Sequence, residues 1–240
     1  MIELNKIYNE DCLETMKRME SNSVDYCLTS PPYNISATSK GLEKYNDYSD
    51  DLSSDDYFTN QSTVIEQMLR ITKKHIFYNI QMVSGNKLAL HKLIGHFADK
   101  IKEVIIWNKG FGQPAICERV FNSAFEYIII LSNKDPGKRY FEDANFDRGT
   151  QSNLFKIKNK HFNSYSKEHD AVMPLDVPRY FIQNFGTVNE IWHDPYLGTG
   201  TTAIAAIKEK RDWIGSEISK EYCDIAQTRI NIELSQMKIF

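Results

Sequence analysis

A doubly wound α/β sheet, with mostly parallel strands between two layers of helices, is the fold that this sequence predicts. Two observations predict it. Seven short apolar segments alternate with amphipathic segments, and a glycine turn joins one strand candidate to the helix candidate after it. The chain has 240 residues, of which 41% are apolar, which is enough for the core of a single domain over residues 1–240.

The strand candidates are short and are apolar or β-branched, as expected for strands buried on both faces. In chain order they are Leu4–Tyr8, Val24–Leu28, His75–Ile80, Ile101–Trp107, Ala124–Leu131, Glu190–Asp194 and Asp212–Glu217.

The helix candidates carry apolar residues three and four positions apart, as in the stripe of Val64, Ile65, Met68 and Leu69. Two helix starts carry a further signal: Pro178 lies in the first turn of one candidate, and Ser219 caps another. In chain order they are Asp11–Glu20, Tyr57–Thr72, Leu88–Phe97, Val177–Phe185, Thr201–Lys208 and Ser219–Leu234.

Two long segments fit neither pattern. Residues 35–56 are polar and rich in aspartate, which predicts a lid loop, because long connections of this kind are commonly functional. Residues 136–167 mix aromatic and basic side chains, and the part from Arg148 to Lys167 holds five basic residues and no acid. The overall net charge of −3 gives no global sign of nucleic-acid binding, so such binding is expected only locally.

Cysteine usage and the N-terminus both predict a cytoplasmic protein. Cys12, Cys27, Cys117 and Cys223 are scattered and form no Cys-x-x-Cys pair, so we expect reduced thiols and no metal site. The first residues lack the layout of a signal peptide, and no apolar run approaches the ~20 residues that cross a bilayer. We therefore expect no membrane partner.

The first chemical motif is Ser30-Pro31-Pro32-Tyr33, directly after a strand candidate. Each proline fixes its own φ and holds the preceding residue extended, so the serine and the tyrosine stand on stiff backbone. In open α/β sheets, ligands bind at the ends of such strands. The segment offers carbonyl oxygens, a hydroxyl and an aromatic face, which suit an amino group on a flat ring. A plain strand-ending turn is the simpler interpretation of two prolines alone.

The second motif runs from Asp194 through Gly198 and Gly200 into a helix candidate, and Glu217 ends the next strand candidate. Gly198 permits a tight turn, and Gly200 is expected to let a ligand approach the backbone. An acid in the position of Glu217 accepts hydrogen bonds from ribose hydroxyls. Together these features predict a site for a nucleoside cofactor.

A nicotinamide dehydrogenase is the first alternative, because Gly198, Gly200 and Ala203 fit the Gly-x-Gly-x-x-Ala fingerprint. Two features oppose it. About forty residues follow the motif, which leaves no room for a second mononucleotide half. A dehydrogenase also gives no role to the Ser-Pro-Pro-Tyr turn.

Taken together, the two motifs resemble those of the S-adenosylmethionine-dependent amino-group DNA methyltransferases. The catalytic motif comes first and the cofactor motif late, as in the β-type permutation of that family. The resemblance implies a seven-stranded Rossmann-like methyltransferase sheet, mostly parallel with the last strand antiparallel. It also implies that the two motifs meet on adjacent central strands.

The resemblance assigns roles to individual residues. Ser30 and the Pro31 carbonyl would orient the target amine, and Tyr33 beside Pro32 would stack on a base flipped out of the duplex. The cofactor would be held by residues of the glycine turn and of two neighbouring strand ends, where Asp11 would take the adenine amino group and Glu217 the ribose. These residues are Asp11, Cys12, Asp194, Pro195, Gly198, Gly200, Thr201, Thr202 and Glu217.

Serine in the first position of the catalytic motif is more typical, in this family, of enzymes that methylate cytosine N4 than of those that methylate adenine N6. We therefore expect a cytosine-N4 enzyme acting on double-stranded DNA, with adenine N6 as the alternative. Methylation of RNA or of a protein glutamine is a further alternative, as is a catalytically silent nucleic-acid-binding module. The resemblance admits a cognate restriction endonuclease as a partner and either a monomer or a homodimer.

Target recognition is expected in residues 136–167, between the last sheet strands and the segment that would hold the methionine end of the cofactor. Basic side chains there are candidates for contacts with phosphates or bases. They are Arg139, Arg148, Lys156, Lys158 and Lys160.

Overall fold

The computed structural model describes residues 2–35, 50–110, 118–135, 137–157 and 173–237. Within them, eight strands form one sheet in the order β1-β8-β7-β2-β3-β5-β4-β6. The strands are β1 (Lys6–Tyr8), β2 (Val24–Thr29), β3 (Thr72–Ile80), β4 (Ile101–Asn108), β5 (Phe125–Leu131), β6 (Leu154–Lys156), β7 (Ile191–Asp194) and β8 (Asp212–Ser216).

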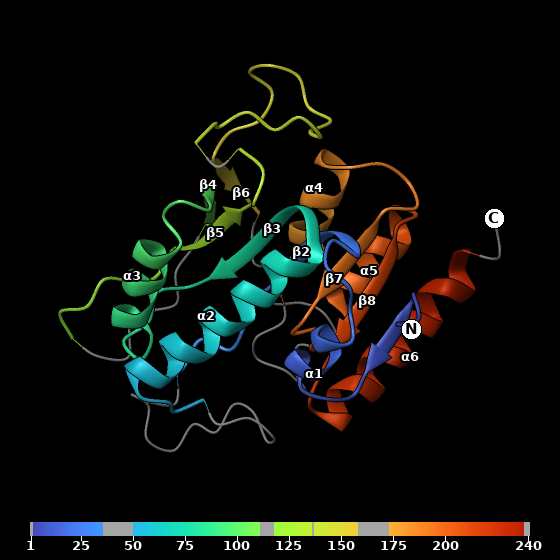
Figure 1. The fold of residues 1–240 in the computed structure, drawn as a ribbon, viewed down its shortest axis with the longest axis horizontal. Helices are drawn as coiled ribbons and strands as arrows, with labels where there is room; N and C mark the ends of the chain where they lie inside the picture. The colour runs from blue at the N-terminus through green and yellow to red at the C-terminus, as the bar shows by residue number, and fades with distance from the viewer. Residues whose placement is uncertain (1, 36–49, 111–117, 136, 158–172, 238–240) are drawn as a thin grey trace.

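Six helices of the described chain cover the two faces of the sheet (Figure 1). One face packs against α1 (Cys12–Lys17), α2 (Ser54–Ile71) and α3 (Lys87–His96). The other packs against α4 (Asp176–Asn184), α5 (Thr201–Lys208) and α6 (Lys220–Met237). The predicted three-layer α/β architecture is therefore confirmed, and every predicted helix and strand is present, with slightly different bounds for all but Thr201–Lys208.

The sheet agrees with the predicted fold class and differs from the expectation in two details. The sheet has an eighth strand, β6, inside the segment predicted to recognise the target, where it pairs with β4. Its three residues are too few to produce a readable period. The antiparallel strand is not the last in the chain but β5, which pairs antiparallel with both β3 and β4. All other pairs are parallel, so β5 alone begins at the edge where its neighbours end.

Burial explains why β2 occupies the centre of the sheet. All six of its residues are buried, which matches the continuous apolar run in the sequence. Tyr26 stacks on Trp192 of β7 with ring centroids 4.4 Å apart, and Phe77 of β3 stacks on the same indole at 5.8 Å. These rings fill the layer between the sheet and helices α4 and α5. The strand ends beyond them are thus held on a rigid base.

No helix in the part of the chain that the structure describes is long and apolar enough to cross a membrane.

Candidate active site

The two sequence motifs meet at one edge of the sheet. Strands β2 and β7 are parallel neighbours, with Tyr26 opposite Trp192 and Cys27 opposite His193. Beyond this pairing, the Thr29 hydroxyl donates to Asp194 Oδ1 at 2.7 Å. The Ser-Pro-Pro-Tyr turn after β2 and the glycine turn after β7 therefore start side by side.

The Ser-Pro-Pro-Tyr turn is fixed by contacts from α2 and from the chain just before it. The Tyr57 hydroxyl donates to the Pro32 carbonyl at 2.7 Å. Asn34, which has a positive φ of 60°, donates its backbone N–H to Asp50 Oδ1 at 2.6 Å. Its side-chain oxygen accepts from the Leu52 backbone N–H at 2.8 Å. These contacts hold the turn in the conformation described here. Of the predicted lid, residues 36–49 lie outside the described chain.

A cluster of polar side chains lies beside the turn, at the ends of β2, β3 and β4 and the start of β5. The Tyr33 hydroxyl donates to Glu126 Oε2 at 2.8 Å and lies 2.8 Å from Ser30 Oγ. Asn79 donates from Nδ2 to the Tyr33 oxygen and to Glu126 Oε2, both at 2.8 Å. Lys109 pairs with Glu126 Oε1 at 3.2 Å, and both of these side chains are only 10% exposed.

The carboxylate of Glu126 fixes the orientation of the Asn79 amide. An ionised carboxylate only accepts hydrogen bonds, so the amide nitrogen must face it. As a result, Asn79 Oδ1 is buried and has no hydrogen-bond partner among the described residues. An orphaned buried acceptor of this kind costs roughly 1–3 kcal/mol. The fold carries that cost in order to point a donor at Glu126 and Tyr33.

The two glycines of the glycine turn have different surroundings. Both Gly198 and Gly200 have positive φ, at 53° and 86°. A Cβ on Gly200 would lie 3.0 Å from the Ala226 Cβ, whereas a Cβ on Gly198 would meet no atom within 4 Å. Gly200 therefore allows α5 to pack closely on α6, and Gly198 is the residue whose bare backbone faces open space. The positive φ of Gly198 agrees with the predicted tight turn, and the packing of Gly200 against Ala226 is a role that the sequence did not indicate.

Gly200→Ala is expected to lower the free energy of unfolding by about 2–4 kcal/mol, because it adds both a strained φ and a contact with α6. Urea unfolding of the purified protein measures this loss. Gly95→Ala in α3 is the matched control: its Cβ would meet nothing within 4 Å, and it should stabilise by about 0.5–1 kcal/mol. Equal losses in the two variants would contradict this role for Gly200.

Two acids without a cationic partner flank the glycine turn. Asp194 is 4% exposed, and burial raises its pKa to about 6. Burial likewise raises the pKa of Glu217, whose carboxylate accepts the backbone N–H groups of Gly198 at 2.8 Å and Ser219 at 2.9 Å. Among the described residues, neither acid forms an ion pair, and no cation contributes to either shift. Two such carboxylates favour a positively charged ligand.

The other predicted cofactor residues surround this turn. Asp11 is exposed and caps α1 by accepting the Leu13 N–H at 2.8 Å, and Cys12 is buried, which raises its thiol pKa to about 12. Thr201 and Thr202 begin α5 and are buried. Pro195 directly follows β7. All of these residues lie at the ends of β1, β7 and β8, which is the edge that carries Ser30.

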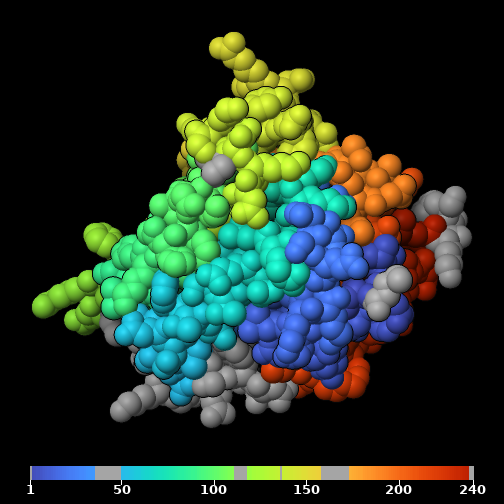
Figure 2. All heavy atoms as spheres, in the orientation of Figure 1, coloured from blue at the N-terminus to red at the C-terminus, as the bar shows by residue number. Residues whose placement is uncertain are grey.

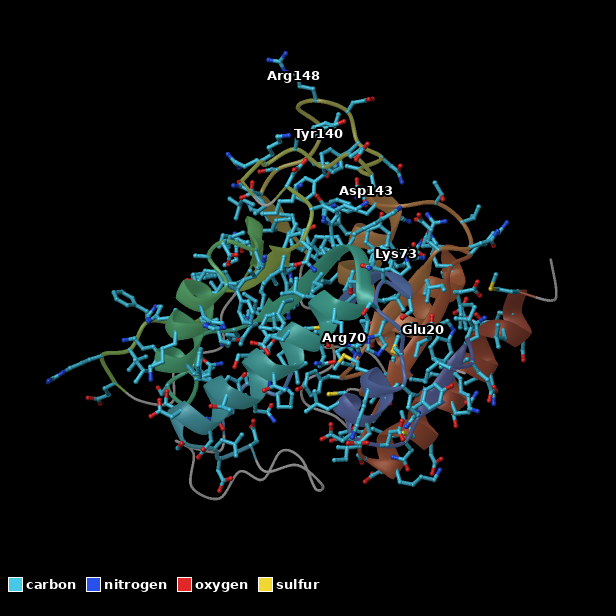
Figure 3. The ribbon with its side chains drawn as sticks, in the orientation of Figure 1. Glu20, Arg70, Lys73, Tyr140, Asp143 and Arg148 are labelled. Atoms are coloured by element: carbon cyan, nitrogen blue, oxygen red, sulfur yellow. The ribbon has the colours of Figure 1, made fainter. Side chains whose placement is uncertain are left out.

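The basic residues predicted to contact DNA fall on two different edges. Lys156 ends β6 opposite Asn108, at the edge that carries the two turns. Arg148 lies in a protrusion at the opposite edge, beyond the points where β2 and β3 begin, together with Tyr140 and Asp143 (Figures 2 and 3). Arg139 pairs there with Glu103 near the start of β4. Lys158 and Lys160 lie outside the described residues.

The protrusion is anchored to the sheet at the edge away from the two turns. Asp143 Oδ1 lies 2.8 Å from Nε2 of the buried His75, and the Tyr26 hydroxyl donates to Asp143 Oδ2. These partners hold the Asp143 pKa at about 2, against the opposing effect of burial. The predicted recognition segment is therefore divided: its first half lies at one end of the sheet, and Lys156 lies at the other.

Sequence reasoning missed three residues of the polar cluster: Asn79, Lys109 and Glu126. A signal was present for two of them. Asn79 and Glu126 are polar residues inside apolar strands, where they need a partner or a function. The antiparallel course of β5 was needed to bring Glu126 to the edge that carries Ser30.

A family model and a bacterial relative both match most of the chain. The model of the DNA methylase family N6_N4_Mtase matches residues 24–228. The orphan methyltransferase M.BamHII of Bacillus amyloliquefaciens is 38% identical over 253 residues, covering 87% of this chain and 89% of the relative.

Two solved structures share the fold. The cytosine-N4-specific PvuII DNA methyltransferase has a TM-score of 0.74 at 18% identity, covering 95% of this chain and 87% of that one. The M1.HpyAVI–SAM complex has a TM-score of 0.68 at 19% identity, covering 94% of this chain and 98% of that one.

Proposed function

The chain belongs to the DNA methylase family whose model it matches. We propose that it is a cytosine-N4 DNA methyltransferase, because serine stands first in its catalytic motif. It transfers a methyl group from S-adenosylmethionine to the exocyclic N4 amine of a cytosine in double-stranded DNA. The observation that carries this proposal is the meeting of an amine-accepting turn with a glycine turn flanked by two unpaired acids.

The residues at the glycine turn fit S-adenosylmethionine. The cofactor carries positive charge on its ammonium and sulfonium groups, which complements Asp194 and Glu217, whereas the negative diphosphate of a dinucleotide does not. Gly198 leaves the backbone open to a ligand. Glu217 would take the ribose hydroxyls, and the start of α5 at Thr201 favours a carboxylate. When bound, the cofactor supplies an electrophilic methyl group, and the chain supplies orientation.

The target base must leave the duplex before its amine can reach that methyl group, at a cost of a few kcal/mol. Stacking on Tyr33 offsets roughly 1–3 kcal/mol of this cost. Ser30 Oγ and the Pro31 carbonyl then accept the amine hydrogens and direct its lone pair at the methyl carbon. Because the turn is held by Tyr57, the acceptors need no reorganisation when the base arrives.

Nucleoside analysis tests both the reaction and the base. Duplex DNA is incubated with the protein and labelled S-adenosylmethionine, digested, and its nucleosides identified by mass. N4-methylcytosine is the expected product. Finding N6-methyladenine instead would show that the target base is adenine. Label in RNA or protein but not in DNA would overturn the substrate class. Cofactor binding without any transfer would identify a silent binding module.

A partner nuclease is part of the proposal, because a methylated amine in a recognition site blocks cleavage there. Once the modified sequence is known, DNA carrying it should resist a restriction endonuclease from the same cells, and unmodified DNA should be cut. If the endonuclease cuts both DNAs, the proposal of a partner nuclease is wrong.

DNA is proposed to approach the edge that carries Lys156. Replacing Lys156, Lys158 and Lys160 by Gln should weaken duplex binding and reduce the salt slope of log K by roughly 1–3, because each phosphate contact contributes about 0.9. Titrations at several salt concentrations measure this slope. Replacing Arg139 and Arg148 by Gln is the control, because Arg148 lies at the opposite edge (Figure 3). An unchanged slope in the lysine variant would contradict the assignment.

A further inference from the structure

The polar cluster beside the catalytic turn forms a continuous chain of hydrogen bonds that ends on a carboxylate. Ser30 Oγ lies 2.8 Å from the Tyr33 oxygen, and the Tyr33 hydroxyl donates to Glu126 Oε2 at 2.8 Å. Glu126 is 8% exposed and is held from its other oxygen by Lys109 at 3.2 Å. The chain therefore connects the amine-accepting serine with a buried negative charge.

Counting hydrogens fixes the direction of this chain. Tyr33 has one hydroxyl hydrogen, and the carboxylate is its stronger acceptor, so that hydrogen points at Glu126. The short contact between Ser30 and Tyr33 then requires the Ser30 hydrogen to point at the tyrosine oxygen. Both hydrogens run toward Glu126, which leaves the Ser30 oxygen an acceptor toward the substrate.

The Asn79 amide is consistent with this direction. Its nitrogen has two hydrogens and three nearby acceptors: Tyr33 and Glu126 at 2.8 Å, and Ser30 Oγ at 3.3 Å. The two shorter contacts take the two hydrogens, so Asn79 competes only weakly for the serine oxygen. A lone pair on Ser30 thus stays available for an amine hydrogen.

We propose that Ser30, Tyr33 and Glu126 form a proton relay that removes the proton released by methyl transfer. This inference rests on the proposed function and adds to it the fate of that proton. The amine lone pair forms the new N–C bond while the electrons of the S–C bond return to sulfur. The nitrogen then carries a positive charge and must lose a hydrogen.

The relay disposes of that hydrogen without a second reagent. The amine proton passes to Ser30 Oγ, the Ser30 proton to the Tyr33 oxygen, and the Tyr33 proton to the Glu126 carboxylate. Glu126 ends as a neutral acid, both hydroxyls are restored, and the product base is neutral. Lys109 holds Glu126 in place as a positioning residue. The proton leaves Glu126 for solvent after turnover.

Two conservative variants test the relay. Tyr33→Phe keeps the stacking ring and removes the hydroxyl, and Glu126→Gln keeps the shape and removes the charge. We expect each to slow single-turnover methylation of duplex DNA about 100-fold, within the usual range for positioned acid–base groups. The affinities for S-adenosylmethionine and for DNA should stay within about 2-fold of the wild type. Glu103→Gln, on β4 at the other edge, should keep the wild-type rate.

The double variant distinguishes a relay from independent contacts. If the two residues act in one chain, Tyr33→Phe with Glu126→Gln should be no slower than the slower single variant, within about 2-fold. At saturating S-adenosylmethionine, which removes the contribution of Asp194 to cofactor binding, the pH profile of the single-turnover rate should change shape in Glu126→Gln. A merely structural role would lower the rate by the same factor at every pH.

The outcomes separate the relay from the proposed function. If the wild-type protein methylates DNA and Tyr33→Phe does so at the same rate, the relay is overturned. It is also overturned if the rate losses of the two single variants multiply in the double variant. Either result leaves the methyltransferase assignment intact. A wild-type protein that methylates no DNA would overturn the proposed function itself. Glu126→Gln leaves the nearly buried Lys109 ammonium without its carboxylate partner. If this prevents folding, the variant that combines Glu126→Gln with Lys109→Met replaces Glu126→Gln in the comparison with Tyr33→Phe.

Discussion

Tyr33→Ala is expected to reduce turnover by about 1,000-fold while cofactor affinity changes by less than about 2-fold. The substitution removes the aromatic face, which is worth roughly 1–3 kcal/mol per stacked base, and also removes the hydroxyl that joins Ser30 to Glu126. The glycine turn keeps its own contacts, so the cofactor site is unaffected. Steady-state methylation assays and cofactor titrations measure the two quantities.

Tyr140→Ala is the matched control for this prediction. Tyr140 is 71% exposed and lies in the protrusion at the opposite edge (Figure 3). We expect wild-type turnover from it. Tyr33→Ala should also be at least several-fold slower than Tyr33→Phe, because only the alanine variant loses the ring. Unchanged turnover in Tyr33→Ala would refute a role for this side chain.

Asp194→Asn should weaken S-adenosylmethionine binding by about 10- to 100-fold without destabilising the fold. A hydrogen bond to a charged group contributes roughly 1.5–3 kcal/mol, whereas one to a neutral amide contributes roughly 0.5–1.5 kcal/mol. Its oxygen still accepts from Thr29 and from the Tyr196 N–H. Calorimetric titration measures the affinity. Asp212→Asn at the start of β8 is the control and should bind the cofactor normally.

The pH dependence of stability provides a second test of Asp194. Its folded-state pKa is about 6, above the ordinary value of 3.8, so the folded protein binds more protons than the unfolded chain between these values. Stability without ligand should therefore fall as the pH rises from about 4 to 6, by up to about 3 kcal/mol from this group. Asp194→Asn should lack this component and melt no lower than the wild type at pH 8. Lower melting there would contradict the assignment.

The sequence predicted the parts of the fold that depend on local pattern. The apolar run of β2 and the stripe of α2 indicated buried elements, and both are present. The sequence also placed the two turns on neighbouring strands through the family resemblance, which the pairing of β2 with β7 confirms. The family and the α/β fold were thus within reach of the sequence alone.

The parts that the sequence missed depend on long-range geometry. The role of Gly200 is decided by Ala226, which is 26 positions later in the chain. In the sequence, Glu126 is a single polar residue in an apolar strand. Only the antiparallel pairing of β5 with β3 and β4 shows that the first residues of β5 lie at the site. Arg139 and Lys156 belong to one predicted recognition segment, yet β6 carries Lys156 to the far edge.

Strand β5 is hydrogen-bonded on both sides, with Glu126 opposite Trp107 of β4 and Tyr127 opposite Ile80 of β3. A shift of the β5 register by one residue would turn Glu126 to the opposite face of the sheet. The hydrogen bonds to both neighbouring strands oppose such a shift. Residues 118–124, which lead into β5, can therefore change in composition without displacing Glu126. Sequence variation is thus tolerated directly beside the polar cluster.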